Sequence, residues 1–173
     1  MKRVDFGASG AVEIRQAILK LAPEFELRPT GTEVEGGYDS TVQQGKPSDY
    51  GVFYRGRPVC HLDVTRSDYS FNHAKPTGDI PVRKNKIEFA KAQKLPLYLV
   101  YDLSLEPFGI EDRCYWMTAQ EASKYPLKHL ETYSGAIAEN YSTNKNAWRK
   151  GLKTLVEEWR KLSKQTLLEY SQP

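Results

Sequence analysis

The chain has 173 residues and a formal net charge of +3 at pH 7, with 39% hydrophobic and 27% charged residues. This composition suits one folded domain and excludes collagen-like and disordered chains. No run approaches the roughly 20 apolar residues of a membrane span, no apolar segment follows the N-terminus, and the two cysteines and three scattered histidines show no zinc spacing. We therefore expect a cytoplasmic protein without membrane contact.

The charge is distributed unevenly along the chain. Residues 55–94 contain nine Lys and Arg against four Asp and Glu, and residues 143–173 contain seven against three. The segments 1–54 and 95–142 are acidic. Localised basic segments favour a nucleic-acid partner, although a solvated charged surface gives the same pattern. Charge alone leaves both interpretations open.

The N-terminal half begins with an amphipathic helix. Residues 10–22 carry apolar side chains at helical spacing, with Ser9 as the expected N-cap and Pro23 as the stop. The segments that follow lack this period: a strand at 25–28, a loop at 30–48, strands at 50–54 and 59–65 around a turn at 55–58, and a loop at 66–81. The two strands around the turn predict a β-hairpin.

The second half alternates between helix and strand. Residues 82–94 have helical spacing and lead into an apolar run at 97–103 that is typical of a strand buried on both faces. The remaining elements are a strand at 113–117, a capping box at 118–121 with a short helix to residue 124, and a long C-terminal helix from about residue 144. The predicted fold class is α/β, with a mixed central sheet flanked by the 10–22 and 82–94 helices.

Two aspartates stand where the hairpin brings its strands together. Alternation in the 59–65 strand places Asp63 on the face opposite to the apolar core side chains. Aspartate has poor β propensity and a buried carboxylate is costly, so Asp63 needs a partner. Asp49, at the start of the preceding strand, returns to the same point, and two carboxylates suit a hard cation such as Mg²⁺. In the alternative, Asp49 caps a turn and Asp63 pairs with a nearby basic group such as Arg66 or Lys84.

Around this pair the chain reads Pro47-Ser48-Asp49 and then Pro58-Val-Cys-His-Leu-Asp63-Val-Thr65. This order and spacing resembles the strand–turn–strand core of the PD-(D/E)XK nuclease superfamily. The resemblance implies a single nuclease-like domain over 1–173, with a restriction-endonuclease-like core at about 8–103 and a C-terminal strand and helical extension at 104–173. It also implies that the two aspartates hold Mg²⁺ or Mn²⁺.

Two further positions are interpreted through the same resemblance. Thr65 stands two residues past the second acid, where the superfamily normally has a catalytic lysine. The segment Gly10-Ala-Val-Glu13-Ile-Arg15 is similar to the first helix of archaeal Holliday-junction resolvases. That similarity implies that Glu13 helps to hold the metal ion.

A lysine on the 82–94 helix offers a replacement for the one missing at Thr65. Lys86 falls inside the apolar arc that should face the sheet, and Gln93 lies one heptad further on the same face. Superfamily members with a lysine that has migrated to this helix, or with a glutamine on it, make both residues catalytic candidates by resemblance. In the alternative, Lys86 extends past the sheet edge to solvent.

The loop 66–75 interleaves basic and aromatic side chains beside the candidate site. Arg66, Tyr69 and Lys75 suit contacts with phosphates and bases, and Lys84 belongs to the same basic segment, although ordinary polar loops share this composition. We expect these four residues to contact DNA. The C-terminal helix, with two tryptophans in its apolar stripe, completes the core or forms a homodimer interface.

Three functions remain. The first is a metal-dependent DNA endonuclease or resolvase-like phosphodiesterase, in which a metal-activated water attacks DNA and Lys86 orients that water or neutralises developing charge. The second is a catalytically inactive PD-(D/E)XK-like DNA-binding protein, and the third is a small soluble protein without a nucleic-acid role. The two acids favour the first function, whereas Thr65 favours the second.

Overall fold

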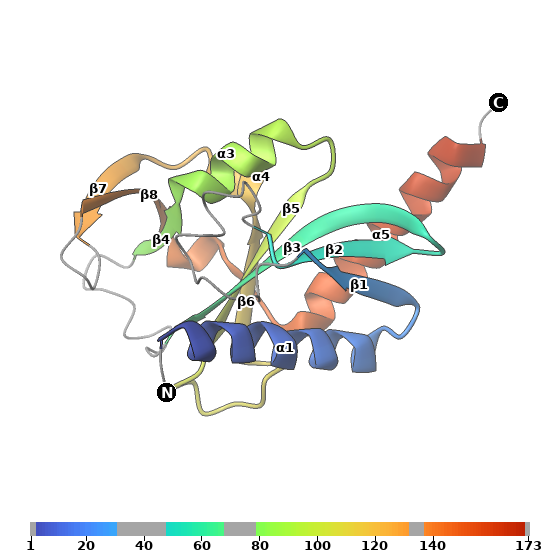
Figure 1. The fold of residues 1–173 in the computed structure, drawn as a ribbon, viewed down its shortest axis with the longest axis horizontal. Helices are drawn as coiled ribbons and strands as arrows, with labels where there is room; N and C mark the ends of the chain where they lie inside the picture. Colours follow the sequence, from blue (N-terminus) through green and yellow to red (C-terminus); the bar gives the residue numbers. More distant parts are fainter. Residues whose placement is uncertain (1–2, 31–47, 68–78, 132–136, 172–173) are drawn as a thin grey trace.

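The computed structural model describes residues 3–30, 48–67, 79–131 and 137–171 (Figure 1). The helices are α1 (Arg3–Leu21), α3 (Lys84–Ala92), α4 (Ala119–Ala122), α5 (Leu152–Ser171) and a 3-10 turn, η2 (Lys145–Ala147). The strands are β1 (Phe25–Pro29), β2 (Tyr50–Tyr54), β3 (Arg57–Ser67), β4 (Asp79–Arg83), β5 (Leu97–Leu103), β6 (Cys114–Thr118), β7 (Leu127–Glu131), β8 (Ile137–Asn144) and β9 (Arg149–Lys150). No helix in these ranges is both long and apolar enough to span a membrane.

The strands form two sheets. The larger sheet has the order β1-β2-β3-β5-β6-β9, and the smaller has the order β4-β8-β7. Among the described strands of the larger sheet, β3 and β5 pair in parallel, and the other neighbours are antiparallel. The fold is therefore mixed α/β with a mixed six-stranded sheet, which confirms the coarse prediction from the sequence.

The β2–β3 hairpin turns at Arg55 and Gly56, which have φ values of 50° and 76°. Positive φ at both central residues is typical of a type I′ turn, whose twist matches that of the paired strands. The strand register sets Tyr50 opposite Leu62, so the residue before β2 comes beside the middle of β3. The predicted hairpin is confirmed, and it brings the two candidate acids to neighbouring strands.

Helices cover both faces of the larger sheet, with α1 below it and α3 above it in the view of Figure 1. On one face, Tyr98 and Val100 of β5 pack in a core shared with α1 and α5. On the other face, Leu97 and Leu99 pack in a core shared with α3 and α4. A continuously apolar strand suits burial on both faces. The prediction for residues 97–103 is confirmed.

The C-terminal helix α5 belongs to the first of these cores. Leu152, Leu155 and Trp159 have no exposed surface. The ring of Trp159 contacts the ring of Phe25 edge-on, with 5.7 Å between their centroids. The helix therefore completes the core of this chain, which was one of the two roles expected for it.

The N-terminal helix is longer than the sequence prediction. It begins at Arg3, so Ser9 lies inside the helix and is not its N-cap. Its end at Leu21 agrees with the stop expected at Pro23. The loop predicted at 30–48 lies outside the described residues, apart from its two ends.

The segment predicted as a loop at 66–81 is partly strand. β3 continues to Ser67, and β4 begins at Asp79 because it pairs with β8, more than 50 residues away in the sequence. β4 is an edge strand of the smaller sheet, a position that tolerates Pro81. Since β4 includes the two residues that the sequence assigned to the next helix, α3 starts only at Lys84.

The predicted start of the C-terminal helix near residue 144 is wrong. β8 runs to Asn144, η2 and β9 follow, and α5 begins at Leu152 after Gly151, whose φ of 97° ends the extended segment. Trp148 therefore lies outside the helix and packs in the second core, where its indole N–H donates to Thr143 Oγ1 at 2.8 Å. β7 and β8 are strands that the sequence reasoning missed.

Candidate functional site

The centre of the site is an ion pair between β3 and α3. Asp63 is only 4% exposed, and its carboxylate accepts a hydrogen bond from the ammonium of Lys86. Lys86 also donates to Thr65 Oγ1 at 3.0 Å. The helical phase therefore placed the lysine correctly. The nearby basic partner of Asp63 is therefore Lys86, and not Arg66 or Lys84, and Lys86 does not extend past the sheet edge to solvent.

The position of Lys86 follows from the way α3 packs on β3. Ile87 and Ala90 are the buried residues of this short helix, so the side chains next to them in projection also face the sheet. One turn after Lys86, Phe89 contacts the ring of His61 edge-on at 5.4 Å. Because His61 and Asp63 share a face of β3, α3 lies along that face. We call this contact line the α3–β3 seam, defined by His61, Asp63, Thr65, Lys86 and Phe89.

Asp49 directly precedes β2 and comes opposite Asp63 when the hairpin register is continued by one residue. Its backbone N–H donates to the carbonyl of Leu62 at 2.9 Å, continuing the hairpin ladder by one residue. Its carboxylate Oδ2 accepts the backbone N–H of Val64 at 2.7 Å. This bond fixes the orientation of the carboxylate on β3. The acid–lysine site, consisting of Asp49, Asp63, Thr65 and Lys86, thus combines two acids, one hydroxyl and one ammonium.

The acid–lysine site suits a hard divalent cation. Within the described ranges, no group of three or more His, Cys, Asp or Glu side chains gathers in a way that could hold a metal ion. Mg²⁺ is commonly bound by one or two carboxylates, with water and substrate phosphate oxygens completing its shell. The two aspartates fit that donor set, with the remaining ligands supplied by solvent and substrate.

Glu13 is paired elsewhere. Its carboxylate accepts from Arg66 Nη2, and Arg66 Nε donates to Asp102 Oδ2 at 3.0 Å. Arg113 Nε donates to the other oxygen of Asp102 at 2.6 Å. Arg66 follows Thr65 in β3 and therefore points to the opposite face, toward α1. For this reason the structure brings Glu13 to a pair of arginines and not to the Asp49–Asp63 pair.

Two of the residues expected to contact DNA are already ion-paired. The Arg66 side chain is 8% exposed, and it links α1 to β3 and β5. The Lys84 ammonium lies 2.6 Å from a carboxylate oxygen of Glu139, which raises the pKa of Lys84. Arg66 is therefore a structural cation, whereas Lys84 stays partly exposed at 42% of its side chain. Tyr69 and Lys75 lie outside the described residues.

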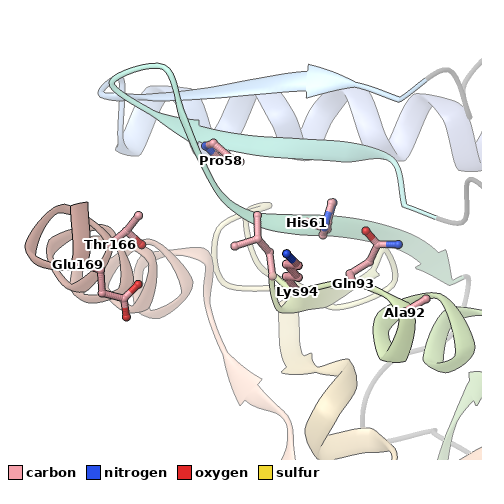
Figure 2. A pocket seen from close by; sticks show the side chains of 8 residues that line it. Pro58, His61, Ala92, Gln93, Lys94, Thr166 and Glu169 are labelled. Carbon is pink, nitrogen blue, oxygen red and sulfur yellow. The ribbon is translucent and has the colours of Figure 1, made fainter.

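A groove of about 630 Å³ lies at the other end of the α3–β3 seam. Figure 2 shows His61 and Gln93 on one side of it and Thr166 and Glu169 of α5 on the other. Its full lining consists of Pro58, His61, Ala92, Gln93, Lys94, Leu95, Thr166 and Glu169. Burial lowers the pKa of His61, so its imidazole is neutral at pH 7.

The groove explains where Gln93 lies. α3 ends at Ala92, and Gln93 is its C-cap, with its backbone N–H donating to the carbonyl of Ala90 at 3.2 Å. Gln93, one heptad after Lys86, therefore lines the groove and not the acid–lysine site. Sequence reasoning missed the contribution of α5, because it treated the C-terminal helix only as a core or dimer element.

Comparison of the chain with protein-family models, with curated proteins and with solved structures finds no match. The chemistry of the site is therefore judged from its geometry. Two carboxylates on adjacent strands can hold a divalent cation, and one ammonium beside them can act on an anion bound to that cation. This combination suits chemistry on a phosphate ester.

Proposed function

We propose that the protein is a metal-dependent DNA endonuclease, or a resolvase-like phosphodiesterase, with a restriction-endonuclease-like core and a cytoplasmic location. The observation that carries the proposal is the contact of the Lys86 ammonium with Asp63 and Thr65. Lys86 reaches from α3 to Thr65, the position at which the superfamily that the chain resembles normally has its lysine. Asp49 on the next strand supplies the second acid.

The charges of the site support this chemistry. Two carboxylates and one ammonium carry a net charge of −1, and a divalent cation changes it to +1. Mg²⁺ or Mn²⁺, when bound by the two aspartates, supplies a water of lowered pKa and positive charge for the phosphate oxygens. The charge of the loaded site then complements the negative charge that develops on a phosphodiester under attack.

Each residue of the acid–lysine site has a separate task in this proposal. Asp49 is held by the backbone N–H of Val64, so one carboxylate is oriented before a ligand arrives. Lys86 donates a hydrogen bond to the attacking water or to a phosphate oxygen. Thr65 accepts a hydrogen bond from Lys86 and holds the lysine ammonium beside β3. Thr65 is thus a positioning residue.

A purely structural role accounts less well for the Asp63–Lys86 pair. Desolvation offsets most of the attraction in a buried ion pair, and apolar residues of similar size often stabilise a fold equally well. Aspartate is also a poor residue for the middle of a strand. A second carboxylate near the pair adds electrostatic repulsion. A structural ion pair has no use for that carboxylate, whereas a cation site needs it as a ligand.

Thr65 favours a second candidate function. A PD-(D/E)XK-like protein that binds DNA without cleaving it fits the loss of the strand lysine. In that case Lys86 neutralises Asp63 and has no role in chemistry. The two candidates predict different effects of replacing Lys86.

The test is cleavage of plasmid and branched DNA with Mg²⁺ or Mn²⁺. Lys86→Met and Asp63→Asn should each lower the cleavage rate by at least about a hundredfold while DNA binding, measured with Ca²⁺, stays within about threefold. Lys91→Met is the matched control, because Lys91 is an exposed lysine on the same helix. Cleavage unaffected by Lys86→Met contradicts the proposed role, and binding without any cleavage by the wild type favours the inactive protein.

A further inference from the structure

The groove at the end of the α3–β3 seam and the acid–lysine site are both built on β3. His61 lines the groove, and Asp63 follows it by two residues on the same face of β3. Two residues of a strand span about 7 Å, which is the length scale of one nucleotide. A DNA strand whose phosphate lies at Asp63 therefore has its neighbouring nucleotide within reach of the groove.

The size of the groove selects a small occupant. At about 630 Å³ it falls within the range of pockets that enclose a single small molecule, from about 300 to 1,000 Å³. A DNA duplex, with grooves of about 6 to 12 Å and two backbones, is far larger. The walls come from β3 and the segment after α3 on one side and from α5 on the other (Figure 2). One nucleotide fits these dimensions.

The lining of the groove offers what a nucleobase requires. Gln93 carries an amide with both donors and an acceptor, and Glu169 carries an acceptor for exocyclic amino groups. His61 lines the groove, and its ring nitrogens can donate or accept a hydrogen bond. Pro58 and Leu95 supply apolar contacts. Lys94 adds the positive charge that suits an adjoining phosphate.

We propose that this groove binds one unpaired nucleotide of DNA next to the scissile phosphate. The inference rests on the proposed nuclease function and specifies its substrate class as DNA with an unpaired nucleotide at a branch, a flap or a frayed end. Gln93 is then a base-binding residue. Unstacking a base costs a few kcal/mol in a duplex and much less where the base is already unpaired, so such substrates are preferred.

Binding is tested without any cleavage, by titrating dAMP and dCMP into the metal-free protein and following the imidazole resonances of His61 by NMR. We expect a saturable shift at His61, and about fivefold to tenfold weaker binding in Gln93→Ala, which is the loss of about one hydrogen bond. Gln120→Ala is the matched control, because Gln120 is exposed on α4, away from the groove lining. The absence of a saturable shift at His61 overturns the proposal.

A second assay compares cleavage of a fully paired duplex with that of the same duplex carrying one unpaired nucleotide. The wild type should prefer the unpaired substrate by at least about tenfold, and Gln93→Ala should reduce that preference. Equal cleavage of both substrates overturns the groove assignment and leaves the nuclease function standing. No cleavage at all contradicts the nuclease function, and the His61 titration still decides whether the groove binds a nucleotide.

Discussion

Replacing Lys86 by methionine should lower the free energy of unfolding, because it breaks the ion pair with Asp63. Asp63 is 4% exposed and the Lys86 side chain 14% exposed, so the pair is nearly buried. Removing one partner of a buried pair costs about 3–5 kcal/mol, against about 0–1 kcal/mol at the surface. Because the small exposure of Lys86 admits some solvent, we expect about 3 kcal/mol for Lys86→Met, with Asp63 left uncompensated.

A double-mutant cycle separates the pair energy from other effects of the substitutions. Asp63→Asn keeps the shape of the side chain without its charge and should cost about 1 kcal/mol, since Lys86 retains the hydroxyl of Thr65 as a partner. The double variant should lose about 2 kcal/mol, which gives a coupling energy of about 2 kcal/mol. The assay is urea unfolding in EDTA with an unchanged m-value. A coupling below about 0.5 kcal/mol refutes the assigned contact.

The same cycle reports on metal binding. A ligand that binds only the folded state stabilises it, by about 2.7 kcal/mol at a concentration one hundred times its Kd. Mn²⁺ should therefore raise the urea midpoint of the wild type, and raise it further in Lys86→Met, because the ammonium that repels the ion is gone. Mn²⁺ should not stabilise Asp63→Asn. Equal midpoints with and without Mn²⁺ in the wild type contradict the proposed cation site.

Three other outcomes follow from the described contacts. Arg66→Met should cost about 3 kcal/mol in urea unfolding because it removes a partner of a fully buried carboxylate, whereas Arg28→Met, in an exposed pair, should barely change the urea midpoint; equal losses contradict the structural role of Arg66. Burial lowers the pKa of His61, so the folded state binds fewer protons than the unfolded chain and the free energy of unfolding falls from about pH 7 to pH 5. His61→Gln should flatten that decline. Parallel plots of unfolding free energy against pH for the wild type and the variant argue against this role of His61. Burial raises the pKa of Cys60 and of Cys114, so both thiols should resist Ellman's reagent until the protein unfolds, and fast labelling of the native protein would show that they are accessible.

The hairpin and the strand beside it were predictable because their signals are local. The turn at Arg55 and Gly56 lies between two β-prone runs, and the apolar run at 97–103 is bounded by turn residues on its N-terminal side. Lys86 was predictable for the same reason, since three or four residues of helix suffice to define its face. These local patterns placed Lys86 on the helix face that meets the sheet, and the resemblance to the superfamily directed it toward the two aspartates.

The smaller sheet could not be predicted from such patterns. Its strands satisfy polar groups across long sequence separations: Ser142 donates to Asp79 at 2.6 Å, and Thr143 donates to the carbonyl of Ile80 at 2.6 Å. Both bonds join residues 63 positions apart. In the sequence, β8 is a polar stretch without alternation of apolar residues, and only pairing with β4 and β7 makes it a strand.

The pairing of Glu13 and Arg66 had a signal in the sequence that was not used. Alternation gives Arg66 the parity of Leu62 and Val64, whose side chains pack against α1. A basic residue of that parity at the end of a core strand indicates a partner on the covering helix, and Glu13 is there. Asp102, the buried acid that completes the cluster, lies opposite Arg66 on β5, a pairing that no local pattern indicates.

The hydrogen bonds between β4 and β8 connect the helix that carries Lys86 to a part of the chain that is distant in the sequence. Arg83 pairs with Asn140 in the smaller sheet and is also the N-cap of α3, so the helix that carries Lys86 starts directly from that sheet. The start of α3 therefore depends on the smaller sheet, whereas Asp63 belongs to the larger sheet. Substitutions in β4 or β8 should therefore change the distance between Asp63 and Lys86 without changing any residue of the site.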